Sequence, residues 1–204
     1  KVAPVVAATN QIELLPALEN NFDRVNEDLI ATYETNLLVT DITVAAIQGK
    51  IDAANLSAAQ TAVGDAETNL TVADVDAAQA LVNYLPDLDP NTVKDGLQDR
   101  LDVVTALIAV ADATTEAELL AALENEVLGL TDVNPAAIAE YKEEIDTNSA
   151  DITTATNVQN NVINAGNTAA LNAAVTAIKT NFPTYDETDA ADQAKALKEL
   201  NRLA

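Results

Sequence analysis

The residues whose spacing comes closest to a known chemical motif are Asp87, Asp89 and Asn91. Oxygen-bearing side chains at alternate positions have the pattern that opens a calcium-binding loop, where carboxylates and amides supply the first ligands. The glycine and the glutamate that such a loop carries at its sixth and twelfth positions are both replaced here. Asp89 also precedes Pro90, a pairing typical of a helix start. The sequence therefore offers half of a calcium motif, with helix capping as the alternative role of Asp89.

Residues for nucleophilic catalysis are nearly missing from the sequence. The chain has neither Cys nor His, and its only serines are Ser57 and Ser149. Neither serine lies in a G-x-S-x-G motif. Both lie where helices or turns would begin, so we interpret them as capping or surface-exposed residues. The 33 acidic residues make carboxylate pairs inevitable, so no pair is singled out for glycoside cleavage. We expect no enzymatic activity and no cofactor other than calcium.

Several segments of the sequence that would position these residues occur twice. Three segments of the first half return in order in the second half: residues 10–20 as 115–125, residues 25–33 as 133–141, and residues 51–55 as 163–167. The separation grows from 105 to 108 and then to 112 residues. Short insertions between elements of constant length explain this growth. Repetition of this kind is typical of arrays built by duplication, which provide reach and surface.

Tyr33 and Tyr141 occupy equivalent positions of the repeat, each three residues after an isoleucine. This spacing places each ring on the apolar face of its helix. We interpret the pair as core residues, with ligand contact as the alternative.

The periodicity of apolar residues predicts an all-α chain. Leucine, valine and isoleucine recur at steps of three and four residues, and strand signals are weak. Asn10, Thr71 and Thr115 each precede an acidic residue by three positions, which is the spacing of a capping box. We expect tandem antiparallel helical bundles built from a duplicated unit of about 105 residues. The expected domains are a linker at residues 1–8, a first unit at 9–113 and a shortened second unit at 114–204.

The composition limits the classes of partner. Ten basic residues against 33 acidic ones give a formal net charge of −23, which disfavours nucleic acid and anionic membranes. No apolar stretch reaches the ~20 residues of a membrane span. The chain opens at Lys1, and we expect it to be a mature or excised piece of a longer protein. Apolar residues make up 49% of it and aromatic residues only 3%, a composition suited to closely packed helices.

The repeated segments, together with residues 80–86 (ALVNYLP) and 97–104 (LQDRLDVV), resemble helical repeats of S-layer and related cell-wall-associated proteins of Gram-positive bacilli. Proteins of that family are acidic, rich in Ala, Thr and Val, and poor in Cys, Met, His and Trp. The resemblance implies a secreted, extracellular protein at the cell surface, and a non-enzymatic subunit or spacer that assembles with calcium.

We therefore expect a structural module that acts as a spacer or assembly unit. Its expected partners are neighbouring copies or domains of the parent surface protein, with cell-wall polymer or calcium as further candidates. The alternative is a binding module: an adhesin, or a domain that holds a cell-wall polymer or a host protein. A large exposed apolar patch on one helix pair would favour that alternative.

Overall fold

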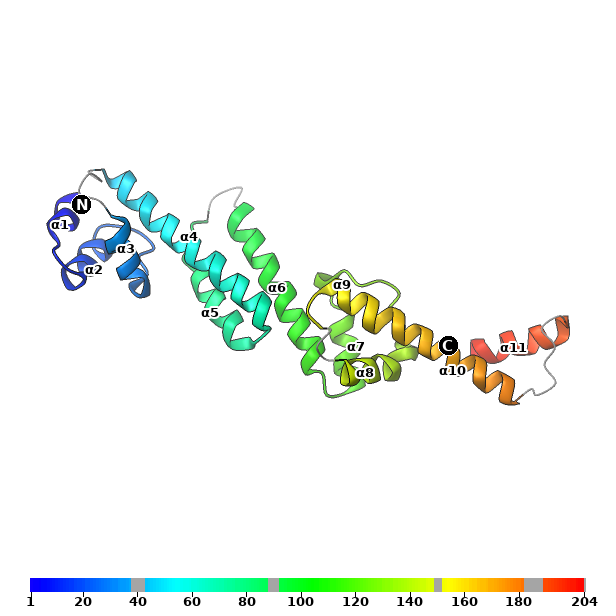
Figure 1. The fold of residues 1–204 in the computed structure, drawn as a ribbon. Helices are drawn as coiled ribbons and strands as arrows, with labels where there is room; N and C mark the ends of the chain where they lie inside the picture. The colour runs from blue at the N-terminus through cyan, green and yellow to red at the C-terminus, as the bar shows by residue number, and fades with distance from the viewer. Residues whose placement is uncertain (38–42, 88–91, 149–151, 182–188, 204) are drawn as a thin grey trace. The chain divides into compact units, whose positions relative to one another are not determined.

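A computed structural model of the chain describes residues 1–37, 43–87, 92–148, 152–181 and 189–203 (Figure 1). All regular secondary structure within these ranges is helical, so the all-α prediction is confirmed. The chain divides into two compact units, Lys1–Thr105 and Ala106–Ala204, and the division falls within helix α6. The predicted domain boundary after residue 113 lies just beyond the end of the same helix.

Unit 1 is arranged around one long helix. Its elements are α1 (Val2–Ala7), α2 (Gln11–Glu19), the 3-10 turn η1 (Glu27–Leu29), α3 (Ile30–Asn36), α4 (Val44–Asn69), α5 (Val72–Asn83) and the first part of α6 (Thr92–Asp112). Helix α1 occupies most of the segment that was expected to be a linker, and its Val5 is buried in the core formed with α2, α3 and α4.

Local hydrogen bonds at both ends determine where α4 begins and where it stops. The Thr43 hydroxyl accepts a hydrogen bond from the Ala46 N–H (3.1 Å), which caps the first turn. At the other end Leu70 adopts a left-handed conformation, and its N–H bonds the Ala66 carbonyl (2.9 Å). Thr71 then caps α5 directly, so α5 folds back along α4 (Figure 1). The short connection allows small side chains of the two helices to bury one another.

Polar side chains join α6 to this pair within unit 1. The Arg100 guanidinium donates two hydrogen bonds to the Glu67 carboxylate on α4 (2.7 and 2.6 Å). The amides of Gln79 on α5 and Gln98 on α6 bond each other reciprocally (2.8 and 2.9 Å). Because the Arg100–Glu67 pair is largely exposed, we expect it to contribute at most about 1 kcal/mol.

Unit 2 contains the end of α6 and a similar order of elements. They are α7 (Glu116–Leu123), the 3-10 turns η2 (Glu126–Leu128) and η3 (Pro135–Ala137), α8 (Ile138–Thr147), α9 (Ala155–Asn157), the π-helical segment η5 (Val158–Asn164), α10 (Ala165–Asn181) and α11 (Ala190–Leu203). The last turn of α9 passes into η5 and then into α10 without a break, so residues 155–181 form one helical run. This run is the counterpart of α4 in chain order.

The π-helical segment accommodates an inserted residue. Gln48 and Gln159 make the same reciprocal pair of hydrogen bonds to a loop backbone, at Asp23 (3.0 and 3.0 Å) and at Thr131 (2.8 and 3.2 Å). The next shared residue, Ile51 in unit 1 and Ile163 in unit 2, lies three positions after Gln48 but four after Gln159. A π turn absorbs one extra residue while the helix continues. One insertion therefore lies inside a helical element, and the expectation that all insertions fall between elements is wrong at this place.

Gly166 allows α10 to approach α8 closely. A Cβ atom at this position would lie 2.9 Å from the Tyr141 Cε1 atom and 3.2 Å from the Tyr141 backbone nitrogen. Unit 1 has Ala54 at the equivalent position of the repeat. Because Gly166 has no side chain, the ring of Tyr141 packs directly against the backbone of α10. A side chain at residue 166 would prevent this contact.

We predict that Gly166→Ala lowers the free energy of unfolding by about 1–3 kcal/mol, because the added methyl overpacks the contact with Tyr141. Gly64→Ala is the matched control, since Gly64 also lies inside a helix and has open space where its Cβ would be. That control should gain about 0.5–1 kcal/mol from the better helix propensity of alanine. Urea unfolding followed by circular dichroism measures both values, and equal effects of the two substitutions would contradict the close approach.

Candidate functional site

A buried tyrosine hydroxyl connects three segments of unit 1. The Tyr33 hydroxyl on α3 accepts a hydrogen bond from the Asn26 N–H (3.1 Å) and donates one to the Asn55 Oδ1 atom on α4 (2.6 Å). The Asn55 amide nitrogen donates to the Arg24 carbonyl (2.8 Å). Asn26 and Asn55 are only 3% and 1% exposed. These three bonds attach the loop before η1 to the middle of α4.

The network holds the loop in a bend that the backbone would otherwise avoid. Arg24 has a φ of 57°, in the left-handed region, which costs about 1–2 kcal/mol for a residue with a side chain. Its carbonyl is bound by Asn55, and its guanidinium forms an ion pair with Asp52 on α4 (3.0 Å). The strained residue is thus attached to the same helix at both its backbone and its side chain.

The same bonds occur in unit 2. The Tyr141 hydroxyl accepts from the Asn134 N–H (2.9 Å) and donates to the Asn167 Oδ1 atom (2.6 Å). The Asn167 amide nitrogen donates to the carbonyl of Asp132 (3.0 Å), which has a φ of 58°. We name each set of three bonds a tyrosine–asparagine network.

In both networks an asparagine side chain caps the helical turn that follows. The Asn26 Oδ1 atom accepts from the Asp28 N–H (3.0 Å), and the Asn134 Oδ1 atom accepts from the Ala136 N–H (3.0 Å). Each asparagine therefore uses its backbone to bind the tyrosine and its side chain to cap a 3-10 turn.

The two networks differ in how well they are covered. Asn134 is exposed and Asn167 is partly exposed, whereas their counterparts in unit 1 are buried. Beside Asn134 and Asn167 lies an open groove of about 870 Å³ between the start of α8 and α10. Leu171 on its wall is 57% exposed. The groove is lined by Asp132, Val133, Asn134, Pro135, Ala136, Glu140, Asn167, Ala170, Leu171, Ala173, Ala174 and Ala177.

Charges near the networks also differ. The positions of Arg24 and Asp52 in unit 1 correspond to Asp132 and Asn164 in unit 2, so the Asp132 carboxylate lies at the rim of the groove in place of the ion pair. Burial raises the pKa of the Tyr33 hydroxyl; the hydrogen bond from the Asn26 N–H opposes this shift, and Tyr84 and Asp52 add to it. The hydroxyl therefore stays protonated at neutral pH and keeps its role as a donor to Asn55.

Two exposed glutamates stabilise the starts of α2 and α7. The Glu13 carboxylate accepts from the Thr9 N–H (2.9 Å) and hydroxyl (3.0 Å), and Glu118 accepts from the same groups of Thr114 (3.1 and 2.8 Å). These hydrogen bonds hold the pKa of both carboxyls below the usual value for glutamate, led by the backbone bond at Glu13 and by the hydroxyl bond at Glu118. Both groups act in helix capping.

The structure decides some of the sequence interpretations. The rings of Tyr33 and Tyr141 are buried, which confirms the core interpretation. Their hydroxyl bonds were not predicted, although Asn55 and Asn167 both belong to the third repeated segment and gave the only available signal. Ser57 is exposed, which agrees with the expected surface role, but it lies in the interior of α4 and not at the start of a helix or turn.

The predicted calcium residues are not all described. Asp87 is exposed and its carboxylate is 2.6 Å from the Lys94 ammonium. Asp89 and Asn91 lie outside the described residues, as does Ser149. Among the residues that the structure describes, no group of three or more acidic side chains is gathered as a metal site. Calcium binding at residues 87–91 stays a prediction.

Comparisons with family models, curated proteins and solved structures gave no match. Within the described ranges, no helix combines the length and the apolar character needed to cross a membrane.

We predict that Tyr33→Phe destabilises the protein by about 1–3 kcal/mol, because it leaves a buried amide N–H and a buried side-chain oxygen without a partner. Tyr141→Phe should cost less, since water can reach the exposed Asn134. Tyr84→Phe removes a hydroxyl outside the networks and serves as the control. Urea unfolding compares the three variants. Equal, negligible losses for Tyr33→Phe and Tyr84→Phe would show that the network contributes nothing to stability.

Proposed function

We propose that this chain is a non-enzymatic structural module of a secreted bacterial surface protein of the S-layer kind, acting as a spacer or assembly unit. The observation that carries the proposal is the recurrence of the tyrosine–asparagine network. The same donors and acceptors bond at matching positions of both units, from Asn26 to Asn55 and from Asn134 to Asn167.

A recurrent network supports an origin by duplication of a helical unit of about 105 residues. The shared bonds join loops to helices and cap 3-10 turns, so what the two units keep in common is a set of structural contacts. In repeat proteins such contacts maintain a scaffold whose surface carries the function.

The chemistry of the described residues agrees with a scaffold. The perturbed carboxyls of Glu13, Glu67 and Glu118 are each explained by a cap or an ion pair. The described core residues are almost all aliphatic, with Phe22, Tyr33 and Tyr141 as the aromatic members, which suits packed helices rather than a concave reaction site. The formal charge of −23 favours cations or basic neighbours as partners over nucleic acid.

Under this proposal the protein works outside the cell, at the cell surface, and its partners are neighbouring copies or domains of the parent protein. Calcium bound by Asp87, Asp89 and Asn91 would reduce the repulsion between such acidic surfaces. The groove of unit 2 favours one alternative, a module that binds a cell-wall polymer or a host protein as an adhesin.

Electron microscopy of the purified chain, with millimolar calcium and with the same concentration of magnesium, tests the structural role. We predict a regular lattice or filament in calcium, because calcium binds more carboxylates at once than magnesium does. Dispersed particles in both conditions would contradict an assembly unit and favour the binding module.

A further inference from the structure

The groove of unit 2 corresponds to a surface that is already occupied in unit 1. Leu171 on α10 aligns with Ala59 on α4, at the 112-residue separation of the third repeated segment. Ala59 is 0% exposed on α4, the helix along which α5 packs, whereas Leu171 is 57% exposed. The chain therefore contains both a filled and an open version of the same helix face.

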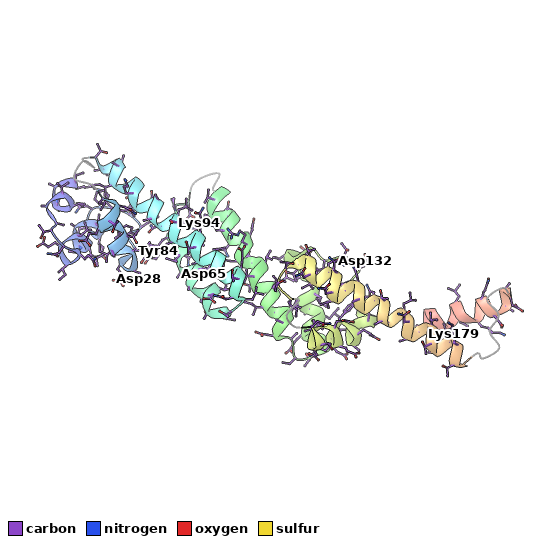
Figure 2. The ribbon with its side chains drawn as sticks, in the orientation of Figure 1. Asp28, Asp65, Tyr84, Lys94, Asp132 and Lys179 are labelled. Atoms are coloured by element: carbon purple, nitrogen blue, oxygen red, sulfur yellow. The ribbon has the colours of Figure 1, made fainter. Side chains whose placement is uncertain are left out.

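The end of α5 also lies close to the network of unit 1. Tyr84 follows the last residue of α5 and is close enough to the Tyr33 hydroxyl to raise its pKa. In the view of Figure 2, the labelled residues Tyr84 and Asp28 (of η1) are near each other in projection. Asn26 is buried there, while its counterpart Asn134 is exposed at the groove. Helix α5 thus packs along α4 in unit 1, while the matching part of α10 lines an open groove in unit 2.

We propose that the groove of unit 2 binds an amphipathic α-helix from a partner chain, with the chemistry of α5. Such a helix has a stripe of small aliphatic residues, like Ala78 and Val82 of α5, and an aromatic residue at its C-terminal end, like Tyr84. This proposal goes beyond the surface-protein proposal and does not depend on it, because it rests on the comparison of the two networks.

The walls of the groove fit this occupant. Ala170, Ala174 and Ala177 lie along one side of α10 and leave room for a second helix at close range. Leu171 gives the occupant an apolar side chain to cover, and the exposed Asn134 offers polar groups to an aromatic hydroxyl.

The rim of the groove adds a preference for positive charge. Asp132 and Glu140 line it, where unit 1 has Arg24 and Thr32 at the equivalent positions. Helix α5 itself contains no Lys or Arg. The occupant in unit 2 is therefore an α5-like helix that carries basic residues at the end near its aromatic residue.

The test uses a fluorescent peptide with the sequence of residues 71–86, titrated with the full chain and followed by anisotropy. We expect saturable binding, tighter for a version extended by two C-terminal lysines. Leu171→Glu should weaken binding at least roughly tenfold, because it introduces a charge under the apolar stripe. Since Leu171 is largely exposed, the variant keeps its fold, and thermal melting verifies this. Ile12→Glu, at an exposed position of α2, is the matched control and should bind as the unaltered chain does.

Three outcomes overturn the proposal. The first is no saturable binding of either peptide, and the second is binding that Leu171→Glu leaves unchanged. In the third outcome the peptides fail to bind and the chain forms a dimer in sedimentation. Leu171→Glu converts that dimer to a monomer, which shows that the groove is the dimer interface. A second copy would then be the occupant. A peptide with Tyr84→Ala tests whether the aromatic residue contributes to binding. It should bind more weakly than the unaltered peptide, whereas non-specific apolar binding would be unchanged.

Discussion

One hydroxyl group in each unit determines how its loop and helices fit together. A tyrosine oxygen can accept one hydrogen bond and donate another at the same time, and Tyr33 and Tyr141 each do both. The accepted bond fixes the loop backbone, and the donated bond fixes an asparagine on the long helix. That asparagine in turn binds the carbonyl of a residue in the left-handed conformation. Local strain in the loop is therefore offset by a buried network whose members depend on one another.

The contrast between the two units shows how a shared framework can carry different surfaces. In unit 1 the network is buried, and α5 packs along α4. In unit 2 the same bonds persist beside an open groove, with Asp132 in place of Arg24 and with Leu171 exposed. The two units share these hydrogen bonds, while the positions around them differ in charge and size.

Much of the helical class could be predicted from the sequence because its signals are local. Thr71 and Thr115 cap helices as their spacing predicts, and Thr115 with Glu118 forms a full capping box. The tyrosine rings were predicted to be buried because periodicity reports the apolar face of a helix. The hydroxyl bonds were not predicted, because their partners lie 22 and 26 residues away and meet only after the chain has folded. The π-helical segment was missed for a related reason, since a one-residue shift in a repeat does not reveal whether a loop or a helix absorbs it. The groove is open among the residues that the structure describes, and no local sequence pattern reports whether a helix face is covered.

The most direct test of the network is amide hydrogen exchange of the Asn26 and Asn134 N–H groups, measured by NMR in the full chain. Both amides bond a tyrosine hydroxyl, so both should exchange far more slowly than in an unfolded peptide, and Asn134 should exchange faster than Asn26 because it lies at the open groove. Tyr141→Phe should remove the protection of Asn134 and leave that of Asn26 in place. Exchange of both amides at the unfolded rate would contradict the claim that these hydroxyl bonds organise the two units.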